Sequence, residues 1–319
     1  MRLVDEVIKY GSVSITGTAK NTGKTECLNY ILRNIPSNVT VATTSIGVDG
    51  ESIDAVTNTS KPEIYLKKGI YFATSETHYR ERKLTSEIVG ISSTSSSLGR
   101  YVTGKTVIEG KIKLSGPSSI ADLGVWMQQA GQFPIDLFLI DGAASRLSSA
   151  TPFVTEAFIL CTGAAACPSI ETLIQQTEYL VTLSLLSEAH EEELLQSQNI
   201  SALTEEKDFF PLEKKCFIVT GALTDKLVNM FIRQKMDGIT LIVKDFTKVF
   251  VSMEVYRHFL TKGGRIAVER SANLIGICIN PTSPYGRKMD SGYLKSELAS
   301  KVNIPVYDLF VSDEVEEFC

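Results

Sequence analysis

Residues 12 to 35 constrain the fold of this 319-residue chain more than any other part of its sequence. Apolar Val13 and Ile15 alternate with polar residues as in a short strand, and the turn-forming stretch GTAKNTGKT follows. Apolar side chains then recur at helical spacing, at Cys27, Leu28, Ile31, Leu32 and Ile35. A strand that leads through a glycine-containing loop into an amphipathic helix predicts an α/β fold.

The loop between these two elements has the chemistry of a phosphate site. The first N–H groups of a helix lack partners within the helix, and the helix dipole is positive there, so a bound phosphate gains several hydrogen bonds. Gly23 lets the backbone approach the phosphates, Lys24 would reach the β- and γ-phosphate oxygens, and the Thr25 hydroxyl would take one position on Mg²⁺. The predicted cofactor-binding residues are Gly17, Thr18, Lys20, Asn21, Thr22, Gly23, Lys24, Thr25 and Glu26.

The loop departs from the commonest phosphate-loop pattern at one position. Thr18 stands where that pattern has its first glycine, and Gly17 comes one residue earlier. Two interpretations of Lys20 stay open. Its side chain would either help to neutralise the phosphate charge or point to solvent. The alternative for the whole loop is a glycine-rich helix cap beside an ordinary Lys–Thr pair.

Acidic residues at two predicted strand ends are the candidates for holding Mg²⁺. The apolar run LFLID ends in Asp141, as a Walker B strand does, although an aspartate that caps a turn is the alternative. Asp49 and Glu51 follow the second predicted strand, and ligands gather at the carboxyl ends of parallel strands. A solvated Asp–Gly turn is the alternative there. The predicted metal ligands are Thr25, Asp141 and Asp49, and the predicted catalytic residues are Lys24 and Asp49.

The hydrophobic pattern predicts a mostly parallel sheet covered by helices, followed by a smaller C-terminal α/β unit. Strands are predicted at 13–16, 39–43, 70–73, 88–91, 137–140 and 158–160, and helices at 24–33, 119–130 and 170–179. The acidic stretch 187–211 predicts a linker between a nucleotide-binding domain, 1–186, and a partner- or ligand-binding unit, 212–319. The serine-rich stretch 92–97 predicts a loop that is either ordinary or a lid.

Charge and composition argue against several classes of protein. A net charge of −5 disfavours nucleic acid as a partner. No apolar run approaches the roughly 20 residues of a membrane helix, and Asp5 and Glu6 interrupt the start, so we expect a cytoplasmic protein without a membrane partner. The six cysteines lack zinc-type spacing and are expected to be reduced thiols that pack as small hydrophobes. The guanine-reading N-K-x-D motif is missing, which favours ATP over GTP.

The loop GTAKNTGKT resembles that of dethiobiotin synthetases and of amidotransferases in cobalamin synthesis, within the MinD-like class of P-loop proteins. Together with TTSIGVDGE, KPEIYLKKGIYFAT, KLSGPSS and LIDGAASR, it looks like the KamB-type subunit of the reactivating factor of adenosylcobalamin-dependent lysine and ornithine aminomutases. That resemblance covers roughly residues 10 to 190. It implies an accessory, chaperone-type role in a hetero-oligomer, with a MutS-like ATPase subunit and an aminomutase client as partners.

For such a role, nucleotide must change the affinity for the client, because a ligand shifts an equilibrium only by its differential binding. The hypothesis is that the γ-phosphate acts through Thr18, Lys24 and Asp49, and that residues 212–319 contact the partner. Two alternatives stay open. One is an autonomous ligase resembling dethiobiotin synthetase, which the missing lysine in TTSIGVDGE disfavours. The other is a nucleotide-binding scaffold without turnover.

Overall fold

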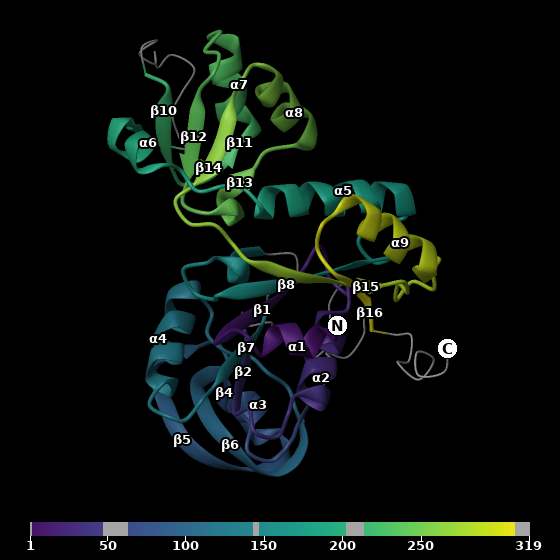
Figure 1. The fold of residues 1–319 in the computed structure, drawn as a ribbon. Helices are drawn as coiled ribbons and strands as arrows, with labels where there is room; N and C mark the ends of the chain where they lie inside the picture. The colour runs from purple at the N-terminus through teal and green to yellow at the C-terminus, as the bar shows by residue number, and fades with distance from the viewer. Residues whose placement is uncertain (1, 47–62, 143–146, 202–213, 310–319) are drawn as a thin grey trace. The chain divides into compact units, whose positions relative to one another are not determined.

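The computed structural model describes residues 2–46, 63–142, 147–201 and 214–309. The chain forms two compact units (Figure 1). The first comprises Met1–Ala150, Val154–Glu178 and Leu274–Cys319, and the second comprises Thr151–Phe153 and Tyr179–Asn273. The predicted division was wrong at its C-terminal end, because the last part of the chain returns to the first unit.

A ten-stranded mixed sheet forms the centre of the first unit, in the order β16-β15-β8-β1-β7-β2-β4-β6-β3, with β5 paired to β6. All neighbours from β16 to β4 are parallel, and β6 runs antiparallel to β3, β4 and β5. The predicted α/β class with a mostly parallel sheet is therefore confirmed. The strands are β1 (Ser12–Gly17), β2 (Val41–Ser45), β3 (Ile64–Leu66), β4 (Tyr71–Ser75), β5 (Lys83–Ser96), β6 (Gly99–Ile112), β7 (Leu137–Asp141), β8 (Ala157–Gly163), β15 (Leu274–Asn280) and β16 (Val306–Asp308).

The serine-rich stretch 92–97 is not a loop. Its residues 92–96 belong to β5, which forms a long antiparallel hairpin with β6, and Ser97 lies in the turn. The turn lies at residues 97–98, and Gly99, which begins β6, has a φ of +89° that glycine adopts without strain. Pairing along the length of β6 therefore overrides the polar composition that predicted a loop.

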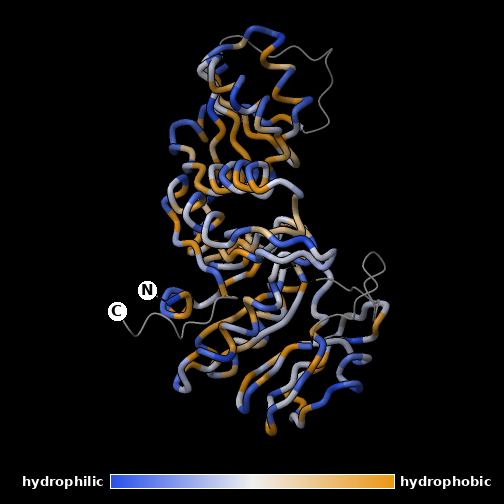
Figure 2. Tube along the Cα trace, turned by 90° about the vertical axis from the view of Figure 1, so that its right-hand side faces the viewer, coloured by the Kyte–Doolittle hydropathy of each residue, from blue (hydrophilic) through white to orange (hydrophobic). Residues whose placement is uncertain are grey.

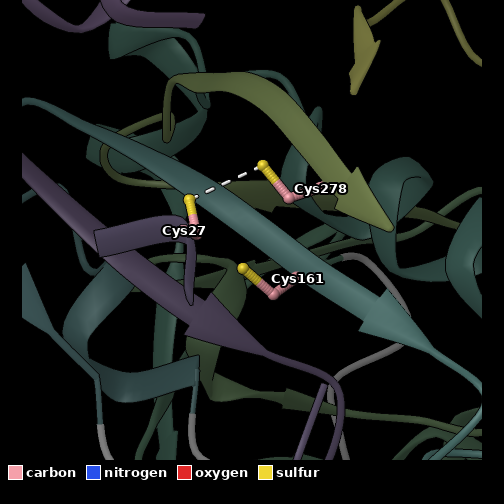
Figure 3. Close-up of side chains that lie close together, drawn as sticks. All are labelled: Cys27, Cys161 and Cys278. Carbon is pink, nitrogen blue, oxygen red and sulfur yellow. Dashed lines mark hydrogen bonds between the residues drawn. The ribbon is translucent and has the colours of Figure 1, made fainter. Parts of the chain in front are cut away.

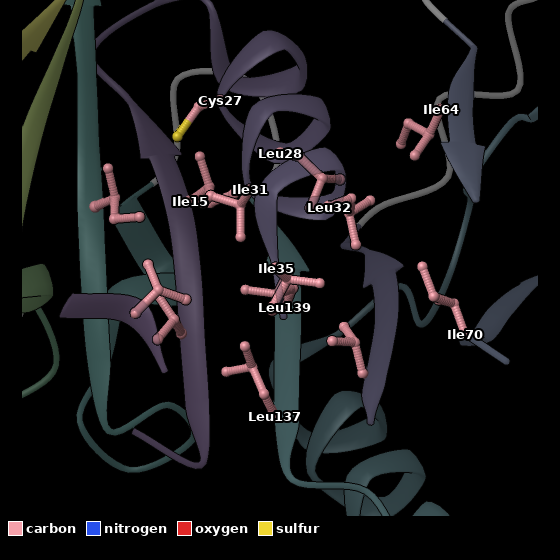
Figure 4. Packing of buried hydrophobic residues seen from close by; sticks show 14 of the residues in the cluster. Ile15, Cys27, Leu28, Ile31, Leu32, Ile35, Ile64, Ile70, Leu137 and Leu139 are labelled. Atoms are coloured by element: carbon pink, nitrogen blue, oxygen red, sulfur yellow. The ribbon is translucent and has the colours of Figure 1, made fainter. Parts of the chain in front are cut away.

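Helices cover both faces of this sheet because successive side chains of a buried strand point to opposite faces. Leu139 of β7 packs in the cluster that contains α2, and its neighbour Ile140 packs in the cluster that contains α4. Figure 4 shows the α2 side chains against the sheet, and Figure 2 shows hydrophilic and hydrophobic residues alternating along the helices. The helices of this unit are α1 (Leu3–Val7), α2 (Lys24–Asn34), α3 (Glu76–Arg80), α4 (Ile120–Ala130) and α9 (Ser291–Lys301), with the short η1 (Leu147–Ala150).

The second unit has its own parallel sheet, in the order β14-β12-β10-β9, and its own apolar core. Its strands are β9 (Gln198–Ser201), β10 (Cys216–Thr220), β12 (Thr240–Val243) and β14 (Arg265–Val268), with the small pair β11 (Leu223–Thr224) and β13 (Val249–Phe250). Its helices are α6 (Glu191–Gln196), α7 (Asp225–Arg233) and α8 (Met253–Thr261), with η2 (Phe246–Lys248), and α5 (Ile170–Ser184) carries the chain from the first unit into it.

The predicted linker, 187–211, is structured where it is described. It contributes helix α6 and strand β9 to the second unit, and only its residues 202–211 lie outside the described part of the chain. Three of the acidic side chains that suggested a linker, Glu191, Glu192 and Glu193, occupy the first turn of α6, where they favour a helix N-terminus. Within the described residues, no helix has the length and apolar character needed to span a membrane.

Two glycines of the first unit should respond in opposite directions to replacement by alanine. A Cβ on Gly163 would lie 2.0 Å from the Asn280 carbonyl oxygen, so Gly163→Ala should destabilise the unit by about 1–3 kcal/mol through overpacking. Gly124, within α4, has open space at this position, so Gly124→Ala should stabilise it by about 0.5–1 kcal/mol.

Urea unfolding followed by the fluorescence of Trp126, the only tryptophan of the chain, measures both variants in the unit that contains them. Equal stabilities for the two variants would contradict the close approach of β8 and β15 at Gly163.

Candidate functional site

The predicted phosphate loop lies between the end of β1 at Gly17 and the start of α2 at Lys24. Its first residue after the strand is tied to the neighbouring strand β8, because the Thr18 N–H donates to the Cys161 carbonyl oxygen at 3.0 Å. The loop is also closed on itself, since the Thr22 hydroxyl donates to the Ala19 carbonyl oxygen at 3.0 Å. These bonds give the loop a defined shape at the carboxyl edge of the sheet.

Both glycines of the loop occupy positions where a larger side chain would be unfavourable. A Cβ on Gly17 would lie 2.5 Å from the Thr22 hydroxyl oxygen and 2.9 Å from the Lys24 Nζ. Gly23 is the N-cap of α2 and has φ +93°, which side chains other than hydrogen rarely tolerate. Asn21 also has a positive φ, +60°, and asparagine is one of the few other residues that accept it. The backbone therefore turns sharply twice before the helix begins.

Lys24 folds back over the loop. Its Nζ donates to the Ala19 carbonyl oxygen at 3.3 Å, and its side chain is partly buried. The ammonium group is therefore held against the loop that leads into α2, and the first N–H groups of a helix lack partners within the helix. Thr25 is also partly buried, whereas Lys20 and Glu26 are exposed. A phosphate in this position would meet the helix N-terminus and the Lys24 charge together.

Asp141 is at the carboxyl edge of the same sheet. It is the last residue of β7, which lies between β1 and β2, and it pairs in register with Ile15 and Ser45. It is 7% exposed, so its carboxylate sits at a buried strand tip next to the phosphate loop. The structure therefore brings Asp141 to the side of the sheet where Lys24 and Thr25 lie. The predicted ligand Asp49, together with Glu51, lies outside the described residues.

Asn280 is a neighbour of the loop that the sequence did not identify. It is the last residue of β15, and its side-chain Nδ2 donates to the Asn21 carbonyl oxygen at 3.3 Å. Its Cβ is 3.2 Å from the position that a Cβ on Gly23 would take. The signal in the sequence was Asn280 before Pro281 at the end of an apolar run, but nothing local connects it to a loop some 260 residues earlier.

A second group of polar side chains lies at the carboxyl end of β4. The His78 Nδ1 is 2.7 Å from the Ser115 hydroxyl oxygen, which in turn is 2.8 Å from the Ser75 hydroxyl oxygen, and all three residues are buried. The segment KLSGPSS that contains Ser115 continues along this edge, where the Ser45 hydroxyl donates to the Leu114 carbonyl oxygen at 2.8 Å. These bonds fix the sheet edge beside β2.

The same segment then enters α4 through an ordinary cap. Ser119 is the N-cap, and its hydroxyl accepts from the Asp122 N–H at 3.1 Å.

Searches of protein-family models, of curated proteins and of solved structures found no match to this chain. Interpretation of the site therefore depends on its own geometry and chemistry.

Replacing Asn280 should loosen the loop without disturbing α2 itself. Asn280→Ala removes the bond to the Asn21 carbonyl, and a neutral hydrogen bond contributes about 1 kcal/mol. Under the sequence-based prediction that this loop binds Mg-ATP, that energy corresponds to a fall in affinity of about fivefold. Calorimetric titration with Mg-ATP measures it.

The matched control is Asn34→Ala, which removes a side-chain bond to the Tyr30 carbonyl at the other end of α2. Equal affinities in the Asn280 and Asn34 variants would show that β15 does not support the loop.

Proposed function

We propose that this chain binds Mg-ATP on residues 17–25 and works as an accessory subunit for an adenosylcobalamin-dependent aminomutase. The observation that carries the first part is the position of Lys24, which folds back over the loop between β1 and the glycine-capped N-terminus of α2 at the carboxyl edge of the parallel strands. Helix N–H groups, a lysine ammonium and a threonine hydroxyl together favour a polyphosphate with a bound divalent cation.

Asp141 supports the magnesium part of this proposal. Its carboxylate lies at a buried strand end beside the loop. A Walker B aspartate occupies the same position, near the coordination shell of Mg²⁺. With Thr25, it would supply two oxygen ligands, and nucleotide phosphates and water would complete the octahedral shell that Mg²⁺ prefers.

The accessory role is supported by the resemblance to KamB-type subunits and by the division of the chain. The second unit has a separate sheet and core. Its surface could therefore bind the MutS-like ATPase subunit or the client. The hypothesis that residues 212–319 form the partner-binding part must change accordingly. Residues 274–319 belong to the phosphate-loop unit, so we assign partner contact to residues 179–273.

This division also determines which truncation is informative. Removal of residues 212–319 would take β15 and β16 out of the first sheet and remove Asn280 from the loop. Lost partner binding after that truncation would not separate a docking defect from a damaged nucleotide site. Point variants of the full chain avoid this problem.

Nucleotide binding is tested by thermal unfolding of the wild type, Lys24→Ala and Lys68→Ala, with Mg-ATP, with Mg-GTP and without nucleotide. Ligand at about 100 times Kd should stabilise the protein by about 2.7 kcal/mol, a rise of several degrees in Tm. The rise should occur with ATP in the wild type and in Lys68→Ala, an exposed lysine between β3 and β4, and should be absent in Lys24→Ala. A full rise in Lys24→Ala would overturn the assignment of the loop.

The accessory role is tested with an aminomutase whose cofactor has been damaged. The expected result is recovery of mutase activity only when this chain, the MutS-like subunit, Mg-ATP and fresh adenosylcobalamin are all present. Lys24→Ala should abolish the recovery and Lys68→Ala should retain it, because only the first removes the phosphate-binding charge. Recovery without nucleotide, or ADP release stimulated by a small carboxylic acid alone, would contradict the accessory role and favour the ligase alternative.

A further inference from the structure

Three cysteines far apart in the sequence meet behind the phosphate loop. Cys27 lies in α2, Cys161 in β8 and Cys278 in β15, and their sulfur atoms all lie within 4.8 Å of one another (Figure 3). The Cys27 and Cys278 sulfurs are 3.6 Å apart. All three side chains are buried, so they form one closed group rather than a surface patch.

The spacing of the sulfurs fits a shared metal ion better than a disulfide. Metal–thiolate bonds of about 2.3 Å place three sulfurs around one ion about 4 Å apart. A disulfide requires about 2.05 Å, so the Cys27 and Cys278 sulfurs would have to approach by about 1.5 Å through a tightly packed region. Closing the existing triangle around an ion needs smaller displacements than that.

We propose that Cys27, Cys161 and Cys278 bind one thiophilic d¹⁰ metal ion, with Cu⁺ preferred over Zn²⁺. Thiolate ligands select soft ions of this kind, and hard ions such as Mg²⁺ prefer oxygen. Structural Zn²⁺ is almost always bound by four ligands. Among the described residues, no fourth cysteine, histidine or carboxylate joins this cluster, and three sulfurs suit Cu⁺.

The ion would connect the elements that shape the phosphate loop. The backbone carbonyl of Cys161 holds the Thr18 N–H, and Asn280, two residues beyond Cys278, holds the Asn21 carbonyl. Cys27 lies in α2, one turn after its N-cap Gly23. A metal bond between α2, β8 and β15 should therefore raise the Tm of the first unit. The site is separate from the nucleotide site and is testable without nucleotide.

The full-length protein, reduced and kept without oxygen, is titrated with Cu⁺ against a chromophoric Cu⁺ chelator, and with Zn²⁺ against a zinc indicator. The expected result is one equivalent of Cu⁺ per chain, weaker Zn²⁺ binding, and loss of the Cu⁺ equivalent in Cys27→Ser, Cys161→Ser and Cys278→Ser. The matched control is the triple variant Cys167→Ser, Cys216→Ser, Cys319→Ser, which removes the other three thiols and should keep the equivalent.

The proposal would be overturned if the control triple variant bound no Cu⁺ while the cluster variants still bound one equivalent. It would also be overturned if the wild type did not bind Cu⁺ tightly. Tighter binding of Zn²⁺ than of Cu⁺ would overturn the metal assignment. If the cluster variants fail to fold, a second measurement on the control triple variant still tests the site, because this variant keeps Cys27, Cys161 and Cys278. One equivalent of Cu⁺ should slow the reaction of its three remaining thiols with a small thiol reagent under native conditions, and unchanged reactivity would contradict the site.

Discussion

The position of β1 between β7 and β8 is the constraint on which the rest of the site depends. All six residues of β1 are buried, and its parallel neighbours fix its register on both sides. Because the three strands end at the same edge, Gly17, Asp141 and Cys161 are brought together by backbone pairing alone. The loop then needs only two glycines and a well-packed helix to direct the N-terminus of α2 toward this edge.

The return of the chain to the first sheet is the second determinant. Strand β15 pairs with β8, which places Asn280 against the phosphate loop and Cys278 opposite Cys161. The loop near the N-terminal end of the sequence is therefore supported by a residue near its C-terminal end, Asn280. The second unit is inserted in the chain between α5 and β15.

Local sequence patterns predicted the elements whose structure depends on local periodicity. The alternation at Val13 and Ile15, the helical spacing from Cys27 to Ile35 and the apolar run before Asp141 all became the expected strand or helix. The hairpin was missed because β5 is rich in serine, and its strand form depends on pairing with β6. Neither Asn280 nor the cysteine cluster has a local pattern, since their contacts follow from the pairing of β15 with β8, which joins distant segments.

The most direct test of the account is a crystal structure of the chain with Mg²⁺ and a non-hydrolysable ATP analogue. The account predicts the β- and γ-phosphates over the N-terminus of α2, with the Lys24 Nζ moved from the Ala19 carbonyl to the phosphate oxygens. It also predicts Mg²⁺ beside the Thr25 hydroxyl and the Asp141 carboxylate. A nucleotide bound elsewhere on the chain, or a loop that stays unchanged with Lys24 still on Ala19 at saturating analogue, would contradict it.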